Sequence, residues 1–100
     1  MDLSINEGTL VVSGGPGDSP SNAITIKKTP KGLSASGAEH LVLTQRYGQR
    51  GTGWTLIRQD LLQSNGRTHD VFTLELQDRS RRTIYFDVTE LLAKANERFL

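Results

Sequence analysis

Two neighbouring runs alternate apolar and polar residues, "WTLIRQDLLQ" at 54–63 and "THDVFTLELQ" at 68–77. Such alternation is typical of strands with one buried face. The residues between them include Asn65-Gly66, the strongest short-range signal for a two-residue hairpin loop, because both central positions of a type I′ turn need a positive φ. This loop places Ser64 opposite Arg67. The same register predicts that Ile57 faces Leu74 and that Leu61 faces Asp70.

The two faces of this predicted hairpin are both partly apolar. The expected core face carries Phe72, Leu74, Leu76, Ile57 and Leu61. The other face carries Trp54, Leu56 and Leu62 together with Arg58 and Asp60. Because that second face is too apolar to be wholly solvated, we expect a helix, the N-terminal segment or another subunit to cover part of it.

A third strand follows "QDRSRR" and carries Ile84 and Phe86 at alternate positions. A three-residue loop, 78–80, keeps both on the core face, with Leu74 opposite Ile84 and Phe72 opposite Phe86. Arg79 then lies at the loop tip, and Arg81 and Arg82 begin the strand. The pattern favours a charged hairpin end, which deters strand pairing between molecules.

Two helices are predicted, one before and one after this meander in the sequence. Ser36 and Glu39 form an S-x-x-E capping box before "AEHLVLTQRYG", so we expect a helix over 37–47 that ends at Gly48. The second helix is "TELLAKANERFL", with Asp87 or Thr89 as its cap and Phe99 on its apolar stripe. Leu41, Leu43 and Tyr47 also fit a strand, which is the alternative for the first segment.

The first third of the chain reads as two short β-favouring runs, 9–12 and 23–28, around the loop "SGGPGDSPSN". A long hairpin is the simple interpretation, and a loose leader over residues 1–20 is the alternative. The sequence as a whole predicts a single α+β domain over 1–100. Its order is β-β-α-β-β-β-α, with an antiparallel β-meander of three central strands, an N-terminal hairpin and two helices against one face.

Composition narrows the classes of function only slightly. The 100 residues carry a net charge of +1, which gives no overall attraction to nucleic acid or anionic lipid. With no cysteine, the chain forms no disulfide and offers no thiolate. No apolar run is long enough for a membrane helix, and the N-terminus does not resemble an export signal. We therefore expect a cytoplasmic protein with no membrane association and no cofactor.

Motifs that would indicate catalysis are weak. "SGGPGDS" lacks the lysine of a phosphate-binding loop, and "GLSASG" lacks the final glycine and the preceding strand of a nucleophile elbow. His69 and Asp60 are predicted to be diagonal neighbours near the hairpin turn. Exposed histidines in such places are mostly plain surface. An enzyme based on that pair is therefore our third hypothesis.

The sequence favours a non-enzymatic binding module that forms a homodimer or binds a protein partner. The candidate interaction surface consists of Trp54, Leu56, Arg58, Leu62 and Tyr85. The alternative is a nucleic-acid-binding domain. Its candidate contacts are six cations expected on one face: Lys27, Lys28, Lys31, Arg79, Arg81 and Arg82.

Overall fold

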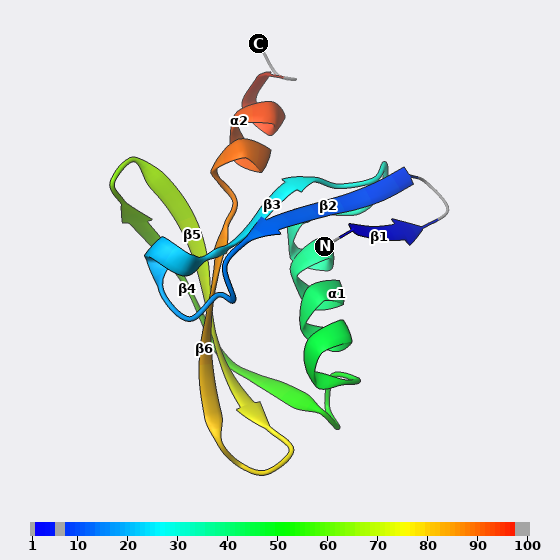
Figure 1. Cartoon of the computed structure of the whole chain (residues 1–100), viewed down its shortest axis with the longest axis vertical. Helices are drawn as coiled ribbons and strands as arrows, with labels where there is room; N and C mark the ends of the chain where they lie inside the picture. The colour runs from blue at the N-terminus through cyan, green and yellow to red at the C-terminus, as the bar shows by residue number, and fades with distance from the viewer. Residues whose placement is uncertain (1, 6–7, 98–100) are drawn as a thin grey trace.

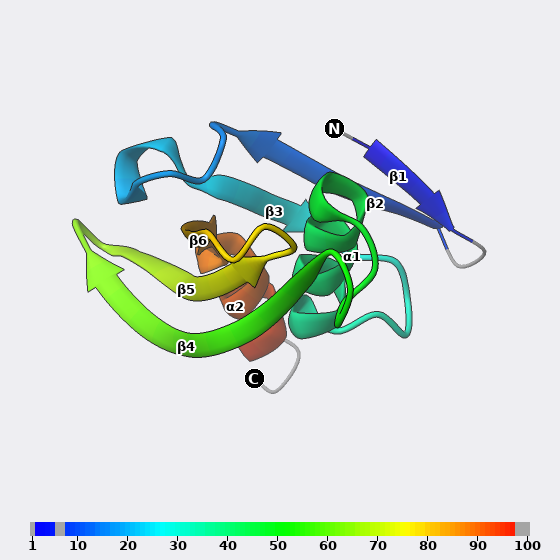
Figure 2. The same ribbon diagram turned by 90° about the horizontal axis from the view of Figure 1, so that it is seen from below.

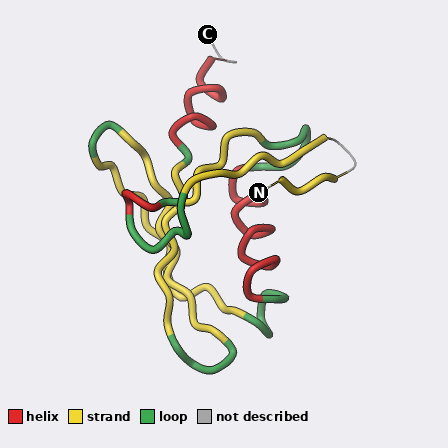
Figure 3. The backbone as a smooth tube through the Cα atoms, in the orientation of Figure 1, coloured by secondary structure: helices red, strands yellow, loops and turns green. Residues whose placement is uncertain are grey.

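The computed structural model describes residues 2–5 and 8–97, which form one mixed β-sheet and two α-helices (Figures 1 and 3). The predicted α+β class is confirmed. The strands are β1 Asp2–Ile5, β2 Gly8–Gly14, β3 Ile24–Lys28, β4 Trp54–Ser64, β5 Arg67–Leu76 and β6 Arg81–Asp87. The helices are the short η1 Pro20–Asn22, α1 Ala35–Tyr47 and α2 Thr89–Glu97.

The six strands lie in the order β1-β2-β3-β6-β5-β4, so β1 and β4 are the two edges of the sheet. The meander β4-β5-β6 and the hairpin β2-β3 follow the prediction. The sequence analysis missed β1, because four residues are too few to show alternation. It also missed the junction of the two halves, where β3 runs parallel to β6 and Ile24 pairs with Phe86.

The core lies where α1 packs between the two halves of the bent sheet (Figure 2). The N-terminal strands contribute Leu10, Val12, Ile24 and Ile26; α1 contributes Ala38, Val42 and Leu43; the meander contributes Trp54, Phe72, Leu74, Ile84, Phe86 and, just beyond β6, Val88. Phe72 and Phe86 meet edge to face at 5.4 Å between ring centroids, a favourable aromatic geometry. Both phenylalanines therefore point inward, as predicted.

Helix α1 begins two residues earlier than predicted. The N-cap is Ser34, whose hydroxyl accepts a hydrogen bond from the backbone N–H of Gly37 at 3.0 Å. The predicted capping box of Ser36 and Glu39 is therefore wrong. Glu39 lies one turn inside the helix on its buried side. Gly48 ends the helix with a φ of 98°, as its position predicted.

The β5–β6 connection differs from its prediction by one residue pair. Phe72 pairs with Ile84 and Leu74 with Arg82, and the Leu76 N–H donates to the Ser80 carbonyl, so the three-residue loop is 77–79. The shift moves the register by two residues and leaves every side chain on its predicted face. Arg79 has a φ of 72°, and Asp78 holds this turn by accepting hydrogen bonds from the N–H and Oγ of Ser80.

Helix α2 starts where β6 ends, and Asp87 caps the first turn of this helix. The Asp87 carboxylate accepts a hydrogen bond from the backbone N–H of Thr89 at 3.0 Å. Thr89 instead uses its hydroxyl to accept from the backbone N–H of Thr68 at 2.8 Å, which fastens the helix to β5. Leu91 packs partly buried against the core, and the predicted contact of Phe99 lies outside the described residues.

Candidate interaction surface

Strand β4 forms one open edge of the sheet, and its far half projects away from α1 (Figure 2). Seven consecutive residues, 57–63, are exposed on both faces of this strand. Three of them are large and apolar: Ile57 is 45% exposed, Leu61 64% and Leu62 36%. An exposed edge strand that is apolar and this long is a template for pairing with another chain.

The register of β4 against β5 departs from its prediction at Ile57. From Ser64 back to Arg58 the pairing follows the prediction, with Leu61 opposite Asp70. At Ile57 the register shifts, and Leu56 instead of Ile57 pairs with Leu74. A β-bulge of this kind inserts one residue and exchanges the faces of everything before it. The predicted pairing of Ile57 with Leu74 is therefore wrong, and Ile57 is 45% exposed instead of lying in the core.

The bulge also changes the role of Trp54. It moves Trp54 and Leu56 to the core face, and Trp54 is only 1% exposed. The Arg50 guanidinium lies 5.6 Å from the centroid of the Trp54 ring, and the His40 ring lies at the same centroid distance. Trp54 is therefore a core residue, and its assignment to an exposed interaction surface is wrong. The alternating sequence of β4 gave no sign of this one-residue bulge.

Three of the four remaining candidate residues lie on one face of the sheet. Arg58 pairs with Thr73 and Leu62 with His69, and Tyr85 pairs with Val71 on the next strand. Cross-strand partners share a face, so Arg58, Leu62 and Tyr85 lie on the face opposite Phe72. Leu56 packs partly buried against the core instead.

The backbone of β4 offers hydrogen-bonding groups at the open edge. Asn65 and Gly66 have φ values of 52° and 74°, the two positive angles of a two-residue I′ turn. In such a hairpin the flanking residues, Ser64 and Arg67, exchange both hydrogen bonds. The alternation along an antiparallel pair then directs the N–H and C=O groups of Gln59, Leu61 and Gln63 away from β5.

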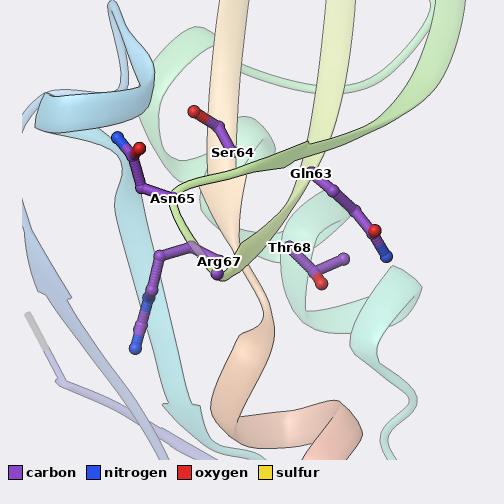
Figure 4. Close-up of a pocket in the computed structure, with 6 residues that line it drawn as sticks. Gln63, Ser64, Asn65, Arg67 and Thr68 are labelled. Atoms are coloured by element: carbon purple, nitrogen blue, oxygen red, sulfur yellow. The ribbon is translucent and has the colours of Figure 1, made fainter.

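The tip of this hairpin is polar and shallowly hollowed (Figure 4). The depression has a volume of about 260 Å³ and is lined by Gln63, Ser64, Asn65, Gly66, Arg67 and Thr68. Arg67 is already engaged there, because its Nε donates to Asp87 Oδ2 at 2.8 Å. Burial acts to raise the pKa of Asp87, but the hydrogen bonds from Arg67 and Thr89 hold it below its usual range.

His69 lies near this ion pair and not on the surface. Its side chain is 3% exposed, and its Nε2 is 3.9 Å from Asp87 Oδ2. The interpretation of His69 as a plain surface residue is therefore wrong. Among the described residues, Asp87 is the carboxylate that forms this contact, in place of the predicted Asp60. Asp60 instead pairs with Arg58, with 2.7 Å between Asp60 Oδ2 and Arg58 Nε.

A second buried acid lies on the opposite face. Glu39 of α1 is fully buried, and neither of its carboxyl oxygens has a hydrogen-bond partner among the described residues. Burial, reinforced by the neighbouring Asp70 carboxyl, raises the pKa of Glu39 to about 10. Glu39 is therefore a neutral carboxylic acid at pH 7. The sequence carries no sign of this burial, because the S-x-x-E pattern predicted a capping role for Glu39.

The six candidate nucleic-acid contacts do not form one face. Arg79, Arg81 and Arg82 lie at the β5–β6 turn, whereas Lys27, Lys28 and Lys31 lie at and beyond the end of β3 (Figure 1). These two segments are well separated along the longest axis of the molecule. The expectation of a single basic face is therefore wrong, because the parallel β3–β6 junction directs the two clusters to different ends.

Comparisons of the chain with protein-family models, with curated proteins and with solved structures find no match. In the part of the chain that the structure describes, no helix is long and apolar enough to cross a membrane. No group of three or more histidine and acidic side chains suited to a metal ion occurs within residues 2–5 and 8–97.

Proposed function

We propose that this protein is a non-enzymatic binding module and that its partner docks along the open edge of β4. The observation that carries this proposal is the exposed run 57–63, which combines apolar side chains with backbone groups directed away from the sheet. A partner strand added here gains main-chain hydrogen bonds and covers Leu61 and Ile57. The proposal keeps Arg58 and Leu62 from the predicted surface and replaces Trp54 with Leu61.

The test is affinity capture of the tagged protein from its native lysate, with and without nuclease. Two variants target the edge: Gln59→Pro removes an outward N–H, and Leu61→Lys places a charge on the apolar run. Arg79→Asp, at the exposed β5–β6 loop, is the control. We expect a stoichiometric protein partner that resists nuclease, is lost with both edge variants and is retained by the control. Equal capture by all four proteins would overturn the proposal.

Nucleic-acid binding is the alternative function, and it now depends on the cluster of Arg79, Arg81 and Arg82 alone. All three side chains are exposed at one hairpin end. Binding through them weakens steeply as salt rises, because each phosphate contact releases counterions. Nuclease-sensitive capture that Arg79→Asp abolishes would support this alternative over the β4 edge.

A further inference from the structure

The exposed part of β4 carries opposite charges on either side of one residue, in the sequence Arg58-Gln59-Asp60. Resting on the proposed function, we infer that the partner at this edge is a second copy of the same chain. In this arrangement β4 pairs antiparallel with β4 of the second copy, about a twofold axis at Gln59. The two sheets then join edge to edge into one continuous sheet.

Backbone geometry limits the registers in which β4 can pair with itself. Paired residues in an antiparallel ladder lie on the same face, so the twofold axis must pass through a residue and not between two residues. Gln59 has its backbone N–H and C=O directed toward the open edge. With the axis at Gln59, the two copies of this residue form a pair that exchanges two hydrogen bonds.

Charge selects among the registers that remain. With the axis at Gln59, Arg58 of each copy faces Asp60 of the other, which gives two cross-strand pairs of opposite charge. An axis at Asp60 sets two carboxylates against each other, which is unfavourable. An axis at Leu61 places Asp60 opposite Leu62, which covers a charge with an apolar side chain.

Arg58 and Asp60 already form an ion pair within one chain, and replacing it by the ion pairs between the two copies costs little. Their side chains are 71% and 46% exposed, and ion pairs this accessible to water contribute little to stability. In the paired state the two arginines and two aspartates form an alternating cluster of four charges across the interface.

Apolar contacts extend this interface on both sides of the charged centre. Moving outward from the axis, Leu61 of each copy reaches the bulge of the other copy, at Leu56 and Ile57. Leu61 is 64% exposed and Ile57 is 45% exposed in the single chain. The burial of Leu61 against Ile57 of the other copy adds apolar contact area to the backbone hydrogen bonds of this interface.

Charge reversal at Arg58 and Asp60 tests the inference by complementation. Arg58→Asp and Asp60→Arg each place like charges across the proposed axis, so each variant alone should dimerise at least about tenfold more weakly than the native chain. An equimolar mixture of the two variants restores opposite charges in both pairs. Sedimentation equilibrium across the micromolar range measures the native chain, each variant and the mixture, with Arg79→Asp as a control that leaves the native dimer unchanged.

We expect a native dimer, two weakened variants and a heterodimer in the mixture. A dimer that tolerates both single reversals would overturn the register and with it the inference. A native chain that stays monomeric across the same range would overturn the second copy as the partner. A monomeric chain would not overturn the proposed function, which the capture experiment tests separately. If capture of a partner is then lost with Gln59→Pro and Leu61→Lys, a strand of a different protein pairs with the same edge.

Discussion

The buried acid Glu39 makes a quantitative prediction about stability and pH. Its folded-state pKa of about 10 lies far above the ordinary value of 4.5, so the folded protein holds this proton where the unfolded chain releases it. A group with a raised folded pKa contributes stability that is fully present below the unfolded value and is lost as pH rises toward the folded one. Glu39 therefore makes the protein less stable with every step from about pH 4.5 to about pH 10.

The magnitude follows from the same shift. Each pH unit within this window costs about 1.4 kcal/mol of unfolding free energy, so the interval from pH 5 to pH 7 costs roughly 2–3 kcal/mol. This is a substantial part of the stability of a small domain. The stabilising effect of Asp87 has the opposite sign, but it is lost only as pH falls below the usual carboxyl range and so leaves this interval almost unaffected.

The assay is urea denaturation at several pH values for the native protein and for Glu39→Gln, with Trp54 fluorescence as the signal. Glutamine keeps the size of the side chain and removes its ionisation, so the difference between the two proteins isolates this one group. We expect the free energy of unfolding of Glu39→Gln, relative to that of the native protein, to increase by roughly 2–3 kcal/mol between pH 5 and pH 7. Glu90→Gln, at an exposed position of α2, is the control. Parallel stability curves for the native protein and Glu39→Gln would refute the reasoning.

Three further variants test other parts of the structure by chemical denaturation. Ser34→Ala removes the N-cap of α1 and should cost about 1 kcal/mol, whereas Ser36→Ala should cost much less; equal losses would contradict the observed cap. Asp87→Asn weakens the bonds to Arg67 and Thr89 and should cost about 2 kcal/mol at neutral pH. Because the pKa of Asp87 is lowered, this loss should vanish as pH falls through the acid range, and a pH-independent loss would argue against the ion pair. At a concentration too low for the chain to associate, Leu61→Lys should change stability by less than about 0.5 kcal/mol, since the side chain is in water in the single chain, and a large loss would show that Leu61 is buried within one chain.

Local signals in the sequence predicted the meander well. Asn65-Gly66 fixed the turn and the pairing of Leu61 with Asp70, and alternation placed Phe72, Ile84 and Phe86 in the core. The turn depends on neighbouring residues, and the core positions depend on the two-residue period of side chains along a strand. Gly48 likewise marked the end of α1 because a left-handed position strongly favours glycine.

Features that depend on distant parts of the chain were missed. The bulge at Ile57 brings Trp54 to the core face, where it lies beside His40 of α1, and the alternating pattern carries no trace of it. Glu39 was predicted to cap the first helix, and His69 was predicted to lie on the surface beside the hairpin turn. Their burial follows from the position of α1 and from the meeting of β5, β6 and α2, which only the tertiary structure shows.

Amide hydrogen exchange along β4 tests the central claim most directly. At a concentration at which the native chain associates, the outward amides of Gln59 and Leu61 should exchange slowly. In Arg58→Asp at the same concentration they should exchange rapidly. The inward amides of Asp60 and Leu62 should be protected in both proteins, because they bond to β5. Rapid exchange of Gln59 and Leu61 in both samples would contradict the account, since it would show that no second copy pairs with the open edge of β4.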